Sequence, residues 1–256
     1  MAVLAWDAIP SVGIAETGKR SELSAAMTNY VDCVRLSVVR AALVQSPDAA
    51  LRLLLAHLVA GTASAHIKAR TEPMQPLTTG ISVSIKGLET EKSMAEARAA
   101  ACIALGVDLR ETVVKTNFDG DTIATAFAKL LTLPDMDVLA ILATVMAETH
   151  ALGSAIVDTV GTQLGANIEG TWAPDATFFD LIRDKEVTNS LLAEVNGAAA
   201  AKRSLTVTTK DQKALIAKGL AGDGRKPAVV WAARWLAFPQ TQYTKRRLSS
   251  VAAPAA

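Results

Sequence analysis

Apolar residues recur at a helical spacing through most of the chain. From 21 to 44 they fall on one stripe, and Ser21 is the predicted cap of that helix. The pattern from 47 to 61 is the strongest in the sequence, because leucines recur at i, i+3, i+4 and i+7 behind a first-turn proline. These stretches predict an N-terminal helical hairpin over 21–61, preceded by a loosely ordered lead-in over 1–20.

The helical pattern is interrupted over 62–88. This stretch is polar and contains several Pro and Gly residues, which favours a linker. Within it Ile81, Val83 and Ile85 alternate with polar residues, as is typical of a β-strand. The sequence therefore predicts one isolated short strand at 81–86.

Helical spacing resumes after this linker. Helices are predicted over 90–105 and 122–131, and a further one begins at Pro134 and continues, with a kink or turn, past Gly153. We expect these segments to form a helical core over 89–165.

The last part of the chain, 166–256, is predicted to be an aromatic-rich helical region. Short helices are expected from Pro174 and over 188–197, followed by a small basic linker over 198–207. A capping box of Thr209 and Gln212 predicts the next helix, and Pro227 is expected to begin the last one. Six large rings of this region should form a core or an interface: Trp172, Phe178, Phe179, Trp231, Trp235 and Phe238.

These patterns together predict an all-α protein, a multi-helix bundle of short helices. The composition agrees, since half of the 256 residues are apolar while only 4% are aromatic.

The apolar run at 138–147 is too short to cross a bilayer, so we expect no membrane partner and a cytoplasmic location. Cys33 and Cys102 stand alone without metal-ligand spacing, and neither a metal nor another cofactor is expected.

Charge is distributed unevenly along the chain. Up to Ala201 there are 15 Lys and Arg against 23 Asp and Glu, a net charge of −8; beyond it there are 11 against 2, a net charge of +9. A basic end on an acidic body favours binding to nucleic acid or to an acidic partner, although a solvated charged face has the same composition. The residues expected to contact DNA phosphates are Lys202, Arg203, Lys210, Lys213, Lys218, Arg225, Lys226, Arg234, Lys245, Arg246 and Arg247.

One segment hints at nucleotide chemistry. Residues 13–19 have the glycine and lysine spacing of a phosphate-binding P-loop, but Arg20 stands where Ser or Thr would bind Mg²⁺. The chain also lacks the alternation of strands and helices that a P-loop fold requires. No motif for a nucleophile or a metal-bound water is recognisable, so we expect a protein that is not an enzyme.

Several strings of residues carry a family resemblance. They include Trp-Ala-Pro-Asp at 172–175 and Phe-Phe-Asp-Leu-Ile-Arg-Asp at 178–184, together with the segments 34–43, 47–61, 145–149, 192–195 and 234–243. In these strings the chain resembles the C-terminal region of ParB-type (ParB/RepB) partition proteins of alphaproteobacterial plasmids and chromosomes. The resemblance implies a non-catalytic module for DNA binding, self-association or contact with a partition partner protein.

The family's N-terminal parts are not recognisable in this sequence. Residues 1–30 contain no Gly-Glu-Arg-Arg string, and no DNA-reading helix-turn-helix can be identified, so CTP binding and nuclease activity are not implied. The chain looks like the C-terminal portion of such a protein, either truncated or standing alone. Two alternatives remain open: a protein-protein interaction module that does not bind DNA, and a nucleotide-binding enzyme that uses 13–19.

Overall fold

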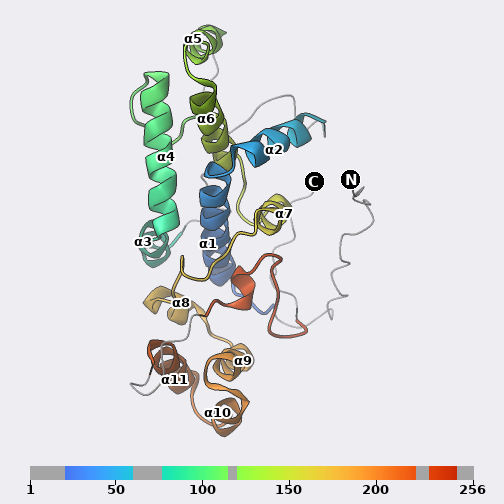
Figure 1. The fold of residues 1–256 in the computed structure, drawn as a ribbon. Coiled ribbons are helices and arrows are strands. Elements are labelled where there is room, and N and C mark those ends of the chain that lie inside the picture. Colours follow the sequence, from blue (N-terminus) through green and yellow to red (C-terminus); the bar gives the residue numbers. More distant parts are fainter. Residues whose placement is uncertain (1–20, 60–76, 115–119, 223–230, 247–256) are drawn as a thin grey trace.

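The computed structural model describes residues 21–59, 77–114, 120–222 and 231–246 (Figure 1). Within these ranges the chain forms helices and no β-strand, so the predicted all-α fold is confirmed. The helices are α1 (Ala25–Val44), α2 (Pro47–Val59), α3 (Thr79–Lys86), α4 (Glu89–Leu105), α5 (Gly120–Leu130), α6 (Asp135–Glu148), α7 (Ala155–Gln163), α8 (Ala176–Leu181), α9 (Lys185–Asn196), α10 (Ala198–Arg203) and α11 (Thr209–Ala221), followed by a short 3-10 helix, η1 (Arg234–Leu236).

The helices are arranged along an elongated body. Figure 1 shows α5 at one end, α9, α10 and α11 at the other, and α1 between them. Helix α1 contacts α2, α3, α4, α6, α7, α8 and η1, which explains why almost every side chain from Met27 to Val39 is buried. A helix that is covered on all sides is a central core helix.

Two apolar clusters lie along α1. The first surrounds Tyr30 and Val34 and includes rings contributed by the end of the chain, such as Phe178 and Trp235. The second surrounds Leu43 and is completed by α2, α4, α6 and α7. Some buried polar residues on α1 are paired: Arg35 bonds Asp158, and the hydroxyls of Ser37 and Thr90 lie 2.5 Å apart. Pairing of this kind is required because an unpaired buried polar group is costly.

Several helix boundaries agree with the sequence patterns. Helices α2, α4 and α6 begin within one residue of their predicted starts, and Gly106 ends α4 with a left-handed φ of 70°. Helix α1 begins later than predicted, because Ser24 and not Ser21 is its cap; the Ser24 hydroxyl accepts a 3.2 Å hydrogen bond from the Met27 amide.

The predicted strand at 81–86 is wrong, since these residues belong to α3. Ile81 and Ile85 are four residues apart and therefore share one face of a helix, on which Ile81 is buried and Ile85 half-buried. Val83 points away and is 66% exposed. Helix α3 lies within the stretch 62–88 predicted as a linker, of which 62–76 fall outside the described residues.

The last predicted helix is also wrong over its described part. Residues 231–233 are not helical, and η1 is a single 3-10 turn. Tertiary contacts explain the difference, because the Arg234 amide donates to the Tyr243 hydroxyl at 3.0 Å and the Trp235 ring is buried against α1. The backbone therefore has partners other than those of an α-helix.

Candidate nucleic-acid interface

Helices α9, α10 and α11 form one packed unit at the end of the molecule. Leu191, Leu192 and Ile216 are fully buried between α9 and α11 and the rest of the first cluster. The stretch 198–207, which was predicted as a basic linker, contains α10. The Asn189 side chain holds α10 in place by donating a 2.9 Å hydrogen bond to the carbonyl of Ala201. These contacts hold α10 and α11 with their polar sides outward.

The cap of α11 differs by one residue from the predicted capping box. Thr208, rather than Thr209, accepts from the Asp211 amide at 3.2 Å, and its hydroxyl donates to the Asp211 carboxylate at 2.7 Å. Gln212 is buried instead and donates a 2.7 Å hydrogen bond to the Ser204 carbonyl. Gln212 therefore fixes the turn between α10 and α11, a role that spacing alone could not reveal.

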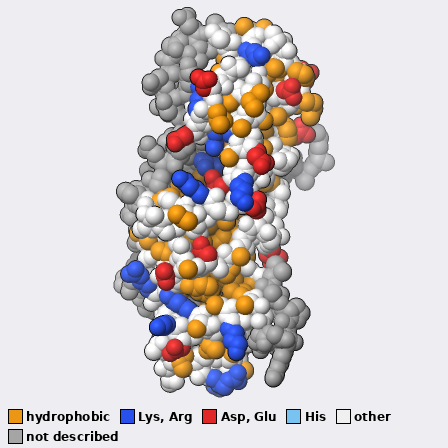
Figure 2. Space-filling model, turned by 90° about the vertical axis from the view of Figure 1, so that its left-hand side faces the viewer, with side chains coloured by type: hydrophobic (Ala, Val, Ile, Leu, Met, Phe, Trp, Pro, Cys, Tyr) orange, Lys and Arg blue, Asp and Glu red, His pale blue; other side chains and the backbone are white. Residues whose placement is uncertain are grey.

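The predicted phosphate-contacting cations on α10 and α11 are mostly open to solvent. Lys202, Arg203, Lys210 and Lys218 are exposed, and none of them bonds to another side chain that the structure describes. Lys213 is half-buried, and this burial lowers the pKa of its ammonium group, while Asp180 acts in the opposite sense. Figure 2 shows Lys and Arg side chains gathered at the lower end of the molecule.

Two further exposed cations lie close to this unit. Arg183 precedes α9 by two residues, and Lys185 is the first residue of that helix. The positive charge of Arg183 contributes to lowering the pKa of Lys213. Neither was predicted as a phosphate contact, because both precede Ala201 and belong to the part of the chain with a net negative charge. The signal that distinguishes Arg183 is its position in space near Lys213 of α11.

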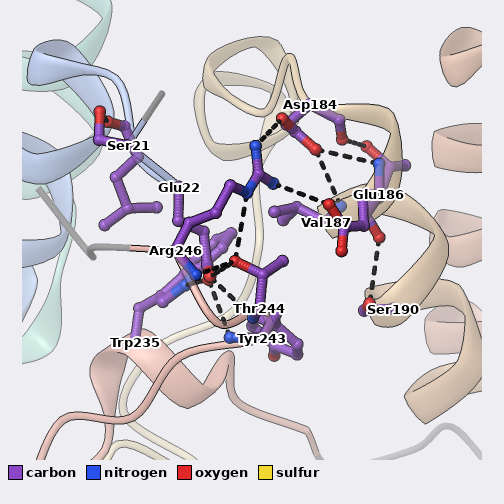
Figure 3. Close-up of polar contacts among 12 residues, drawn as sticks. Ser21, Glu22, Asp184, Glu186, Val187, Ser190, Trp235, Tyr243, Thr244 and Arg246 are labelled. Atoms are coloured by element: carbon purple, nitrogen blue, oxygen red, sulfur yellow. Dashed lines mark hydrogen bonds and ion pairs between the residues drawn. The ribbon is translucent and has the colours of Figure 1, made fainter. Parts of the chain in front are cut away.

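Arg246, predicted to contact phosphate, is bound inside the protein instead. Figure 3 shows its guanidinium group against Asp184, to which it donates a 2.7 Å hydrogen bond, while Glu186 lies 3.4 Å away. The hydrogen bond to Asp184 raises the pKa of Arg246, and the same bond lowers the pKa of the Asp184 carboxyl. Arg246 therefore neutralises the acidic start of α9.

Arg234 also has an intramolecular partner, although its side chain is 51% exposed. It forms an ion pair with Glu194 of α9, and its guanidinium lies 5.1 Å from the centre of the Tyr243 ring. Glu194 also accepts hydrogen bonds from the Trp231 indole at 3.2 Å and the Tyr243 hydroxyl at 2.8 Å. The carboxylates of α9 are thus neutralised internally, which leaves the lysines of α10 and α11 to dominate this surface.

A buried carboxylate attaches the end of the chain to the start of α1. Glu22 is 5% exposed and accepts from the Trp235 indole at 2.6 Å, the Tyr243 amide at 2.9 Å and the Thr244 amide at 2.8 Å (Figure 3). The Thr244 hydroxyl adds a 2.6 Å bond. Nothing in the sequence pattern indicated this role for Glu22.

The six predicted rings belong to the core of the described structure. Trp172, Phe178 and Trp235 are buried, and Phe179, Trp231 and Phe238 are half-buried against the same cluster. Phe178 is central, with edge-on contacts to Trp172 at 5.1 Å and Phe179 at 5.6 Å between ring centroids. These rings consequently pack the α9–α11 unit against the rest of the first cluster.

The remaining predicted residues lie outside the described ranges, with one exception. Arg225, Lys226, Arg247 and the P-loop-like segment 13–19 lie outside the described residues, while Lys245 is exposed. In the described ranges there is no group of three or more His, Cys, Asp and Glu side chains that could hold a metal ion. A search of the same ranges finds no helix long and apolar enough to cross a membrane.

Comparison with known proteins adds no relative. No family model, curated protein or solved structure matches this chain.

Proposed function

We propose that this protein is a non-catalytic DNA-binding and assembly module, and that α10 and α11 contact the phosphate backbone of duplex DNA. One observation carries the proposal: four exposed cations on these helices make no bond to described side chains, while Arg234 and Arg246 neutralise the neighbouring carboxylates of α9. A surface of this kind gives attraction to phosphate without base-specific readout.

The exposed face of α11 supports close approach to a polyanion. Lys210, Ala214 and Lys218 follow one another at four-residue spacing on one side of α11, and the small residues Ala214 and Ala217 are exposed there. Lys202 and Arg203 extend the same charge onto α10. Together with the resemblance to partition proteins, this surface favours a role in plasmid or chromosome partition.

The test is duplex binding across a salt titration. Replacing Lys202, Arg203, Lys210 and Lys218 by Gln should weaken binding and reduce the slope of log K against log salt by up to about 3 to 4. A matched control replaces Arg52, Lys86, Lys92 and Lys129, which are exposed cations on other helices, and removes the same total charge. The control should bind with a slope close to that of the unmodified chain.

Two results would contradict the proposal. Equal weakening by both variants would mean that net charge alone, and not the α10–α11 surface, attracts DNA. Binding that neither salt nor either set of substitutions changes would exclude phosphate contact as its basis.

A further inference from the structure

The exposed large apolar side chains are concentrated at one end of the described structure. Six of the ten lie between residues 103 and 136, on the last turn of α4, on α5, on the loops that follow these two helices and at the start of α6. Phe127, Leu131 and Met136 are 61%, 70% and 69% exposed, and the others are Ile103, Val107 and Leu109. We call these six residues the apolar end. Clusters of exposed apolar residues mark sites of association, whereas scattered ones do not.

The local architecture explains why these side chains are uncovered. The core beneath them has only Ala101, Cys102, Val113 and Ile141 as fully buried members among the described residues. Helix α5 packs against α4 and projects at the extremity of the molecule (Figure 1), so no further described helix covers its outer side. The apolar end is thus a surface that the described helices leave exposed.

The charge around the apolar end is negative. The segment 103–137 contains six carboxylates and three cations, a net charge of −3, and Asp108, Glu111, Asp135 and Asp137 are exposed there. At the opposite end of the body, the segment 198–221 contains five cations and one carboxylate, a net charge of +4. This basic end also exposes two apolar side chains, Leu205 and Leu215.

We infer that the apolar end binds the α10–α11 end of a second copy of this chain. Contact between two apolar ends would place like charges opposite one another, which disfavours association, whereas contact with the basic end pairs opposite charges around an apolar centre. Because the two surfaces lie at opposite ends of the body (Figure 1), each association leaves one surface of each kind free. The assembly is therefore head to tail and grows beyond a dimer.

The experiment uses two variants with one altered surface each. Phe127→Gln with Leu131→Gln alters the apolar end, and Leu205→Gln with Leu215→Gln alters the basic end; all four side chains are exposed, so folding should be retained. Val83→Gln is the matched control, because Val83 is 66% exposed on α3, away from both ends. Mass is measured by sedimentation over a range of protein concentrations, without nucleic acid, and circular dichroism checks the fold.

The expected pattern is specific to a head-to-tail contact. The unmodified chain and Val83→Gln should grow in mass beyond a dimer as concentration rises, and less so at high salt. Each double variant alone should associate roughly tenfold more weakly or worse, since central apolar contacts carry most of an interface's free energy. An equal mixture of the two variants should form a dimer and nothing larger, because one intact surface of each kind remains.

Three results would overturn the inference. The unmodified chain could stay monomeric at all concentrations, the basic-end variant could still dimerise by itself, or the mixture could remain monomeric. The second result would indicate contact between two apolar ends. The sedimentation experiment contains no nucleic acid, so it tests association separately from DNA binding. A protein that binds DNA but stays monomeric would refute this inference and leave the proposed function standing. A protein that associates head to tail but does not bind DNA would refute the proposed function and leave this inference standing.

Discussion

The indole N–H of Trp235 donates a 2.6 Å hydrogen bond to the carboxylate of Glu22, across 213 positions of sequence. The same carboxylate accepts from the amides of Tyr243 and Thr244. One side chain at the start of α1 thereby fixes the last described segment of the chain. That segment in turn carries Arg234 and Arg246 to the carboxylates of α9.

Glu22→Ala should lower the free energy of unfolding by about 2 to 4 kcal/mol, because several buried donors would lose their acceptor. Urea denaturation followed by tryptophan fluorescence measures the change. Glu89→Ala is the control, since Glu89 is exposed and pairs only with Lys92 on the surface of α4, and its loss should be about 0.5 kcal/mol or less. Similar losses for the two variants would show that Glu22 does not hold the segment.

Arg246→Gln should destabilise the protein by about 1 kcal/mol at neutral pH, through loss of its charged hydrogen bond to Asp184. Since Arg246 lowers the pKa of Asp184 below its ordinary value of 3.8, the contribution is present above that value. It is lost as the pH falls through the lower pKa of the folded state. Unfolding measured from pH 7 down to pH 3 should therefore show the variant and the unmodified chain converging, and a pH-independent difference would argue against the ion pair.

Asp32→Asn should stabilise the protein at pH 8. Burial raises the pKa of this carboxyl from 3.8 to about 6, against the opposing charge of Arg35. The ionised form is therefore disfavoured in the fold, so stability is lost as the pH rises from 4 through 6, and the amide avoids that loss. We expect a gain of about 1 to 3 kcal/mol at pH 8 and almost none near pH 4, measured by thermal unfolding at both values. An equal gain at the two pH values would mean that ionisation is not the cause.

Gly161→Ala should be destabilising by about 1 to 3 kcal/mol, although alanine normally favours a helix. Gly161 is buried in α7, and an added Cβ would overlap the ring of Phe238, which itself packs over Arg35 at 4.7 Å. Gly80→Ala on α3 is the matched control, because its Cβ would meet Thr177 at an ordinary 3.6 Å. The control should be neutral or stabilising by up to about 1 kcal/mol. Thermal unfolding of both variants distinguishes a local clash from a general effect of helix propensity.

The strong helical periods were readable from the sequence, while the wrong predictions at α3 and η1 share one cause. In α3, Ile81, Val83 and Ile85 fit either a strand or a helix over so few residues, and packing of Ile81 in the core decided between them. At η1, the spacing of Trp231 and Trp235 fits a helix, but Glu194 and Glu22 bond their indoles. Short segments take the conformation that their distant partners require.

The candidate interface was predicted only in outline. The excess of Lys and Arg after Ala201 indicated a basic end, and Lys202, Arg203, Lys210 and Lys218 are exposed there. Counting charges along the chain could not show that Arg234 and Arg246 are paired internally, because ion pairing depends on distances in space. It also could not reveal that Arg183 lies near Lys213 of α11.

By itself, the sequence determined the all-α class and the approximate extents of α1, α2, α4 and α6, since helical periodicity and caps act over a few residues. The tertiary structure decided which charges face solvent, which carboxylates are neutralised, and that the acidic apolar end lies opposite the basic end. The physical reason is the range of the interactions. Helix formation is local, whereas burial and ion pairing join residues such as Glu22 and Trp235 that are close only in the folded chain.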